Sequence, residues 1–203
     1  MSIIIKAIPI YNFLNYCNDS DLDKNVLDCG AGGAIPPLYI FYKNGYKTYG
    51  IDSSKTQIDK AEKFCKKNNI MLNIKEGDMK SLEFPDQYFS FIYSYNSIFH
   101  MKKSEIVCVL NEIKRVLKKD GLCFVNFLSR YDSRFREGIE ITDGEYLQEE
   151  DDSDIIHSYF YDNEAEKYLK DFKIIFKEKK VTEKYIDNKK YRLAYIEYIV
   201  KKR

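Results

Sequence analysis

The stretch Asn25-Val26-Leu27-Asp28-Cys29-Gly30-Ala31-Gly32-Gly33-Ala34 decides the fold class of this 203-residue chain. An apolar pair ends in a carboxylate, three glycines follow within four positions, and Pro36-Pro37 precedes an apolar run over 38–42. Glycine permits positive φ and lets a ligand lie against the main chain, while proline near a helix start loses only N–H groups that have no intrahelical partner. The stretch predicts a strand, a tight turn that forms a nucleotide-type cradle, and a helix.

The carboxylate of Asp28 limits which nucleotide this turn can bind. In the dinucleotide motif G-x-G-x-x-G the pyrophosphate lies at the helix N-terminus. Aligned on Gly30 and Gly32, the third glycine would fall at Ile35, and an acidic residue two positions before the first glycine would repel a phosphate. The pattern argues against a nicotinamide oxidoreductase and favours a cationic ligand. From this stretch alone, a glycine turn that only packs a helix on a sheet stays open.

The stretch resembles the first motif of the class I S-adenosylmethionine-dependent methyltransferases, an acidic residue followed by G-x-G. The family's ligand carries an ammonium and a sulfonium. Four further segments resemble the family in the same order along the chain: Tyr49–Ser54, Glu76–Lys80, Phe91–Met101 and Ile113–Leu122. The last of them departs from the pattern, because Asp120 stands where a glycine is common.

The resemblance implies S-adenosylmethionine as cofactor, with S-adenosylhomocysteine as product. An acidic residue about 20 positions past the glycine turn accepts hydrogen bonds from ribose hydroxyls, and Asp52 fits that position unless it only caps the next helix. Asp78 would meet the adenine amino group, and Met79 would cover the ring. The cofactor-binding residues predicted in this way are Asp28, Gly30, Ala31, Gly32, Asp52, Ser53, Asp78, Met79, Tyr95 and Asn96.

Strand and helix patterns alternate along the chain, which predicts a parallel sheet with helices on both faces. Strands are predicted at 25–28, 47–52, 71–75, 88–95 and 122–128, the last after a stop at Gly121, and helices near 10–16, 38–42, 54–65 and 105–117. Another strand is predicted within 168–177 and a last one at 192–200, with a polar turn at 186–190 that favours a hairpin. We therefore expect an α/β, doubly wound, mostly parallel seven-stranded sheet with an antiparallel last strand, the Rossmann-like methyltransferase fold.

The length fits a single domain over 1–203. Within it we expect a short N-terminal helical cap (1–23) and an acidic insertion or lid after strand five (129–160). Between Glu137 and Asp154 there are acidic residues but no Lys or Arg; the nine are Glu137, Glu140, Asp143, Glu145, Glu149, Glu150, Asp151, Asp152 and Asp154. Such a run is typical of a solvated surface hairpin. The alternative is a lid that attracts a cationic acceptor.

Methyl transfer from a sulfonium is an in-line displacement that depends mainly on alignment and on exclusion of water. A base is needed only if the acceptor must lose a proton, and the two histidines, His100 and His157, are the candidate catalytic residues. His100 follows strand four, where a packing role is the alternative. His157 lies in the segment predicted to cover the acceptor pocket.

Composition sets the remaining limits. The formal net charge is +1, with 33 Lys and Arg scattered along the chain against 32 Asp and Glu, so nothing indicates a nucleic-acid partner. The five cysteines, three of them (Cys29, Cys108 and Cys123) in apolar runs, lack C-x-x-C spacing and are interpreted as buried hydrophobes in a reducing compartment. We expect no metal site. The chain lacks a signal segment or an apolar run of membrane length, which predicts a cytoplasmic protein without membrane contact.

The sequence thus predicts a methyltransferase for a small-molecule acceptor. The lack of a Pro-Pro-Tyr-type motif after strand four, where the chain reads Tyr93-Ser94-Tyr95-Asn96-Ser97, argues against a nucleic-acid amino-methyltransferase. A protein or RNA acceptor and a non-catalytic S-adenosylmethionine-binding protein remain alternatives. The acceptor, its attacking atom (N, O, S or C) and the oligomeric state are not determined by the sequence.

Overall fold

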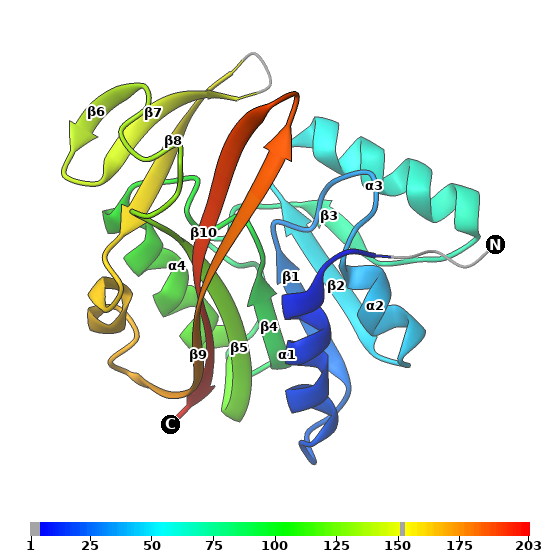
Figure 1. Ribbon diagram of the computed structural model, residues 1–203. Coiled ribbons are helices and arrows are strands. Elements are labelled where there is room, and N and C mark those ends of the chain that lie inside the picture. The colour runs from blue at the N-terminus through cyan, green and yellow to red at the C-terminus, as the bar shows by residue number, and fades with distance from the viewer. Residues whose placement is uncertain (1–4, 151–152) are drawn as a thin grey trace.

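The computed structural model describes residues 5–150 and 153–203, and Figure 1 shows its arrangement. The first half contains α1 (Ile8–Asn18), β1 (Asn25–Cys29), α2 (Leu38–Lys43), β2 (Lys47–Asp52), α3 (Lys55–Asn68), β3 (Ile74–Glu76) and β4 (Phe89–Ser94). The second half contains α4 (Lys103–Val116), β5 (Leu117–Ser129), β6 (Ile139–Thr142), β7 (Glu145–Glu150), β8 (Ser153–Phe160), the 3-10 helix η1 (Glu164–Lys167), β9 (Phe172–Ile186) and β10 (Lys189–Lys202).

Seven of the ten strands in the described sheet, which we call the main sheet, follow the order β3-β2-β1-β4-β5-β10-β9. The first five are parallel, β10 is antiparallel to β5, and β9 is antiparallel to β10. Asp187 and Asn188 join β9 to β10 with φ of 48° and 61°, values typical of a tight hairpin turn. The predicted doubly wound, mostly parallel fold with an antiparallel last strand is confirmed. The expected seven strands are extended to ten in the described sheet, because β8, β7 and β6 continue it from β5.

Helices cover both faces of this sheet, because its parallel strands are apolar on both sides. All six residues of β4 are buried. On one face, α1 and α2 pack their apolar residues, among them Phe13 and Phe41, against Phe91 and Phe124 of the strands. On the other face, the predicted inward stripe of α4 is buried: Ile106, Val109, Leu110, Ile113 and Val116. None of the helices in the described part of the chain is long and apolar enough to cross a membrane.

Two predicted strand starts are wrong, for local reasons, and the strand predicted within 168–177 continues as β9 to Ile186. Strand three was expected at 71–75 but β3 begins at Ile74, because Asn73 has a φ of 55° and pairs with the sheet through its side-chain amide, 3.0 Å from the Thr48 carbonyl oxygen. Strand five does not begin after Gly121. It begins at Leu117, which pairs with Phe89, and the next four residues form an irregularity before pairing resumes at Leu122.

The predicted insertion after strand five is a β-meander, which we call the β6–β8 lid. β6 and β7 are antiparallel, β7 and β8 are antiparallel, and β8 joins the main sheet by pairing with the end of β5. Its small core contains the buried side chains of Phe99, Leu128, Tyr146 and Tyr159. The lid lies at the upper left of Figure 1, beside the outer part of the β9–β10 hairpin. Two of the nine acidic residues, Asp151 and Asp152, lie outside the described residues, as do residues 1–4 of the predicted cap.

Arg115, near the end of α4, anchors the segment that follows β3. Its guanidinium donates to the carbonyl oxygens of Leu82 and Phe84 and to Asp86, each at 2.8 Å, and it also binds both oxygens of Glu112. The planar fork of arginine suits several such acceptors at once, whereas the ammonium of lysine does not. Arg115 therefore fixes the chain that runs on from Asp78 and Met79.

We expect the substitution Arg115→Met to lower the free energy of unfolding by about 1–3 kcal/mol, because it leaves two partly buried carbonyl groups and the Glu112 carboxylate without their donor. Urea unfolding followed by circular dichroism would measure this. The neighbouring variant Lys114→Met loses only the exposed ion pair with Asp171 and serves as the control, with an expected change below about 1 kcal/mol. Equal effects of the two substitutions would contradict this role of Arg115.

Candidate active site

Two adjoining cavities lie outside the carboxyl ends of the parallel strands, where ligands bind in open α/β sheets. The larger has a volume of about 590 Å³, and its lining includes Asp28, Gly30, Gly32, Asp52, Tyr95, Asn96, His100 and Glu150. The smaller, of about 420 Å³, is lined by residues that include Asp52, Ser53, Asp78, Met79 and His100. Because Asp52, His100 and Ile155 line both, the two cavities form one extended site.

Asp28, the last polar residue of β1, is buried without a full set of partners. Its side chain is 1% exposed, and its Oδ2 atom has no hydrogen-bond partner among the residues that the structure describes. Burial raises the pKa of this carboxyl to about 8, an effect that the Tyr93 hydroxyl offsets in part and the Asp52 carboxylate increases. A buried, unpaired carboxyl at a cavity wall is costly unless a cation binds there, so this oxygen fits the ammonium group of an amino-acid ligand.

The glycine turn is held by backbone bonds and by Asp52. The N–H groups of Gly30 and Ala31 donate to the Ile51 carbonyl oxygen, both at 2.9 Å. Asp52 accepts the Gly32 N–H at 2.8 Å through Oδ2 and the Ser54 N–H at 2.8 Å through Oδ1. At Gly30, where φ is 99°, a Cβ atom would lie 2.1 Å from the Ser97 hydroxyl oxygen, so only glycine fits between the turn and the loop after β4.

The structure places nearly all the predicted cofactor-binding residues on these cavities. Asp28, Gly30, Gly32, Asp52, Tyr95 and Asn96 line the larger, and Asp52, Ser53, Asp78 and Met79 line the smaller. Ala31 is fully buried within the turn. Asp52 is not the N-cap of α3, because Ser54 takes that position; its Oδ1 atom accepts the Ser54 N–H, and each of its carboxylate oxygens can accept a further bond.

Several residues that line the site or support its lining could not be predicted from the sequence. Asn126 on β5 exchanges two hydrogen bonds with Asn96, accepting its N–H at 2.8 Å and donating to its side-chain oxygen at 2.7 Å, which holds Asn96 at a φ of 54°. The main-chain carbonyl oxygen of Gln57 accepts the Gly33 N–H at 2.9 Å. Glu150 and Ile155 reach the cavity from the lid. No local pattern marks these residues, because each lies far along the chain from the glycine turn.

The two predicted catalytic histidines meet in space. His100 follows β4 and lies on the wall of both cavities, and His157 of β8 lies next to it with ring centroids 4.6 Å apart. Burial lowers the pKa of His100 to about 4, and the proximity of His157 contributes to the shift. Burial also lowers the pKa of His157, whose side chain is 3% exposed. Both imidazoles are therefore neutral near pH 7.

Several carboxylates of the acidic segment form ion pairs on the lid. Both oxygens of Asp143 bind the Arg130 guanidinium, at 2.9 and 2.6 Å, and Glu137 lies 3.6 Å from Arg134. Glu145 accepts the Lys103 N–H at 2.7 Å and so fastens the lid to the start of α4. Glu145 itself is 5% exposed, so not all carboxylates of this segment lie on the surface. Among the cysteines, Cys108 is exposed, so its predicted burial is wrong; its apolar run forms a helix and places it on the solvent side.

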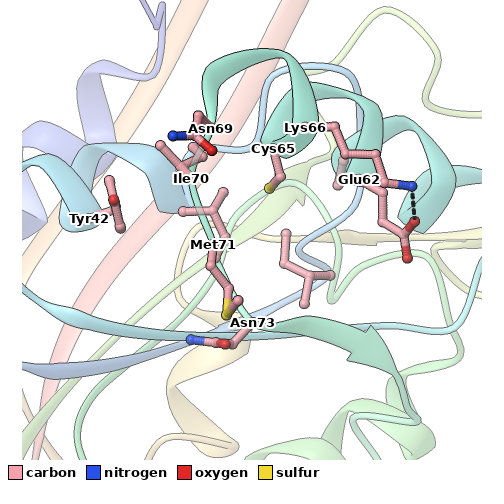
Figure 2. A pocket seen from close by; sticks show the side chains of 11 residues that line it. Tyr42, Glu62, Cys65, Lys66, Asn69, Ile70, Met71 and Asn73 are labelled. Carbon is pink, nitrogen blue, oxygen red and sulfur yellow. Dashed lines mark hydrogen bonds and ion pairs between the residues drawn. The ribbon is translucent and has the colours of Figure 1, made fainter.

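A cavity of about 960 Å³ lies elsewhere, between α3 and the chain that leads into β3 (Figure 2). Its lining includes Tyr42, Cys65, Met71 and the Glu62–Lys66 ion pair, whose side chains are 55% and 78% exposed. None of the buried, unpartnered side-chain atoms found in the described residues lies on its lining. The size of this cavity is not evidence of a binding site. We therefore place the candidate site at the carboxyl ends of the strands.

Comparison with known proteins agrees with this geometry. The model of a family described as "Methyltransferase domain" matches residues 27–125. The phosphoethanolamine N-methyltransferase of Plasmodium falciparum is 26% identical over 162 residues, which cover 76% of this chain and 60% of that protein. The sterol 24-C-methyltransferase of Pneumocystis carinii is 32% identical over 132 residues, which cover 59% of this chain and 34% of that protein. The matches thus span only part of these relatives.

Among solved structures, a SAM-dependent methyltransferase from Methanosarcina mazei has a TM-score of 0.74 with 20% identity, covering 98% of this chain and 99% of that one. This likeness concerns the fold. The fold is therefore the Rossmann-like fold of S-adenosylmethionine-dependent methyltransferases of known structure. Over residues 27–125 the chain is similar to a methyltransferase domain, and the curated relatives that it matches are named as methyltransferases.

The raised pKa of Asp28 has a measurable effect on the stability of the ligand-free fold. The folded carboxyl binds its proton up to about pH 8, whereas an unfolded Asp releases it near 3.9. Between these values the native state binds more protons, so stability falls as the pH rises. We expect the free energy of unfolding of the parent chain to fall, relative to Asp28→Asn, by up to about 1.4 kcal/mol per pH unit in this range.

Urea unfolding at pH 5, 6, 7 and 8 would measure this difference. The control is Asp59→Asn on the exposed side of α3, which should follow the parent chain at every pH. Parallel pH curves for the parent and Asp28→Asn would contradict a raised pKa at Asp28.

Proposed function

We propose that this chain is an S-adenosylmethionine-dependent methyltransferase that transfers a methyl group to a small-molecule acceptor. The observation that carries the proposal is the Asp28 carboxyl on the cavity wall, whose Oδ2 atom has no hydrogen-bond partner among the described residues. The glycine turn and Asp52 line the same cavity. The two carboxyl groups can accept hydrogen bonds from the ammonium group and the ribose hydroxyls of a ligand. The similarity of residues 27–125 to a methyltransferase domain supports the same cofactor.

Six of the predicted residues would bind different parts of that cofactor. Asp28 would bind the ammonium, the turn at Gly30 and Gly32 would lie against the main part of the ligand, and Asp52 would accept ribose hydroxyls with its remaining lone pairs. Asp78 and Met79, on the smaller cavity, would bind the adenine. Bound there, the cofactor supplies an activated methyl group on a sulfonium. The residues of this chain align it and keep water away, which is the main demand of an in-line displacement.

The acceptor side of the site lies between the loop after β4 and the lid. Tyr95, Asn96, His100 and Glu150 line the larger cavity there. His100 is the residue we propose to contact the acceptor, because it is neutral near pH 7 and lies on the cavity wall. His157, buried behind it, positions His100. If the acceptor must lose a proton, the free lone pair of His100 can hydrogen-bond that proton, but a pKa lowered to about 4 makes this imidazole a weak base.

A small acceptor fits this arrangement, because the lid closes over the strand ends. Ser158 of β8 donates to the Phe99 carbonyl oxygen at 2.9 Å through its N–H and to the Met101 carbonyl oxygen at 2.6 Å through its hydroxyl. These bonds hold β8 against the loop that carries His100. Phosphoethanolamine and sterols, in the names of the relatives, are small molecules that differ in their attacking atom. The attacking atom here would be found by assaying amine, thiol, hydroxyl and carbon acceptors.

Isothermal titration with S-adenosylhomocysteine tests the cofactor. We expect micromolar binding and no binding of NADH, and Asp52→Asn should weaken the affinity by about 5- to 150-fold, since it removes a charged hydrogen-bond partner worth about 1–3 kcal/mol. The exposed neighbour Asp59→Asn should bind like the parent chain. A folded protein that does not bind S-adenosylhomocysteine would overturn the proposal. Binding without turnover of any acceptor would favour a non-catalytic binding protein.

The affinity for S-adenosylhomocysteine should also depend on pH. The ammonium of the ligand prefers the ionised form of Asp28, whose pKa is raised to about 8 in the ligand-free protein. We therefore expect the affinity to rise by up to about 50-fold from pH 6 to pH 8. The rise should disappear in Asp28→Asn, and a pH-independent affinity in the parent chain would show that this carboxyl does not meet the ammonium.

A further inference from the structure

Three side chains from different parts of the chain converge at the wall of the larger cavity. His100 comes from the loop after β4, Glu150 from the end of β7 and His157 from β8, and one ligand atom of each lies within 4.8 Å of the others. Glu150 Oε2 is 2.9 Å from His157 Nε2 and 4.0 Å from His100 Nδ1. We call this group the His-Glu-His cluster.

His157 is buried and the other two side chains of the cluster are partly buried, but the cluster has few hydrogen bonds. His157 is 3% exposed, and Glu150 Oε2, His100 Nδ1 and His157 Nδ1 are buried atoms that make no aligned hydrogen bond within the described part of the chain. Buried polar atoms in folded proteins are nearly always paired, so such a concentration of exceptions calls for a partner. Two neutral imidazoles have free lone pairs, and the carboxylate supplies a negative charge between them.

We propose that His100, Glu150 and His157 bind a divalent ion of the first transition series, such as Zn²⁺. Two imidazole nitrogens and one carboxylate oxygen are a donor set for zinc, iron or cobalt, whereas calcium and magnesium prefer oxygen ligands alone. A single ion at about 2.0–2.2 Å from each ligand atom needs those atoms about 3–4 Å apart. The observed separations require side-chain shifts of about 1 Å.

The backbone around the cluster is suited to hold such an ion. The two bonds from Ser158 to Phe99 and Met101 fix β8, and with it His157, against the loop of His100. The pairing of Gln148 with Ile155 and of Tyr146 with His157 sets the position of β7 relative to β8. An ion at this place would tie the lid to the loop after β4. It would also lie beside the cavity, because His100 and Glu150 are both on its lining.

One cation competes for the same carboxylate. Arg134 Nη1 lies 3.8 Å from Glu150 Oε2, but the Arg134 side chain is 36% exposed and its guanidinium also donates to the Glu149 carbonyl oxygen at 3.1 Å and lies near Glu137. The contact with Glu150 is longer than a hydrogen bond. Arg134 can therefore move aside and keep its other partners when an ion binds.

Metal titration of the tag-free, chelator-treated protein tests the proposal. We expect one Zn²⁺ per chain by isothermal titration at pH 7.5, and a visible Co²⁺ spectrum without the sulfur charge-transfer bands of a thiolate ligand. Each of His157→Gln, Glu150→Gln and His100→Asn should lower the Zn²⁺ affinity at least tenfold. Glu150→Gln alters a half-exposed side chain, so it tests the site even if His157→Gln fails to fold.

Matched controls separate this site from unspecific binding. Glu149→Gln changes the exposed neighbour of Glu150 and should leave the affinity unchanged, as should Cys108→Ser, which removes the exposed thiol. Arg134→Gln removes the competing cation without removing a ligand, so the affinity should stay the same or rise. Absence of Zn²⁺ binding, or equal binding by the parent chain and Glu150→Gln, would overturn the proposal. So would a loss with Arg134→Gln as large as with the ligand variants.

The metal site and the proposed methyl transfer can fail separately. S-adenosylhomocysteine binding is measured on the same metal-free protein, where it depends on Asp28 and Asp52 rather than on the cluster. Intact binding of S-adenosylhomocysteine without binding of Zn²⁺ overturns the metal site alone. Binding of Zn²⁺ without S-adenosylhomocysteine overturns the proposed function alone.

Discussion

The two hydrogen bonds that the Asp52 carboxylate accepts, from Gly32 and Ser54, hold the candidate site together. One fixes the turn between β1 and α2, and the other fixes the start of α3, so a single side chain sets the distance between the two strand ends. A Cβ at Gly32 would lie 2.7 Å from Asp52 Oδ2 and 2.4 Å from the Gln57 Cβ, which leaves glycine as the residue that permits this contact. The cavity exists because these backbone segments are kept at this spacing.

Local sequence patterns determine most of the fold, so the elements that depend on them could be predicted from the sequence. The glycine turn, the buried stripe of α4 and the turn at 187–188 each depend on residues within a few positions of one another. The errors arise where a tertiary contact decides a boundary. Asn73 takes a left-handed conformation because its amide reaches Thr48, and the irregularity before Leu122 matches β5 to β4; neither is written in the local pattern.

The same distinction between local patterns and tertiary contacts applies to the candidate site. The predicted cofactor-binding residues follow the ends of predicted strands, and the parallel topology brings strand ends to one edge. The parallel topology does not determine where the residues of the lid lie. Glu150 reaches the cluster only because β7 pairs with β8 in one register, and a shift by one residue would turn His157 to the other face. The sequence showed two histidines and an acidic run as separate features, and their contact depends on long-range strand pairing.

Two places in the candidate site bury polar groups in a similar way. Asp28 and the His-Glu-His cluster lie on the same cavity, and both include buried polar atoms that have no aligned hydrogen bond within the described residues. In a chain of marginal stability such groups are a net cost, since burial raises the pKa of Asp28 and lowers that of both histidines. A cation relieves the cost at the carboxyl of Asp28, and a metal ion would relieve it at Glu150 and the imidazoles. The unfavourable arrangement of the ligand-free protein is therefore what makes both places receptive to positive charge.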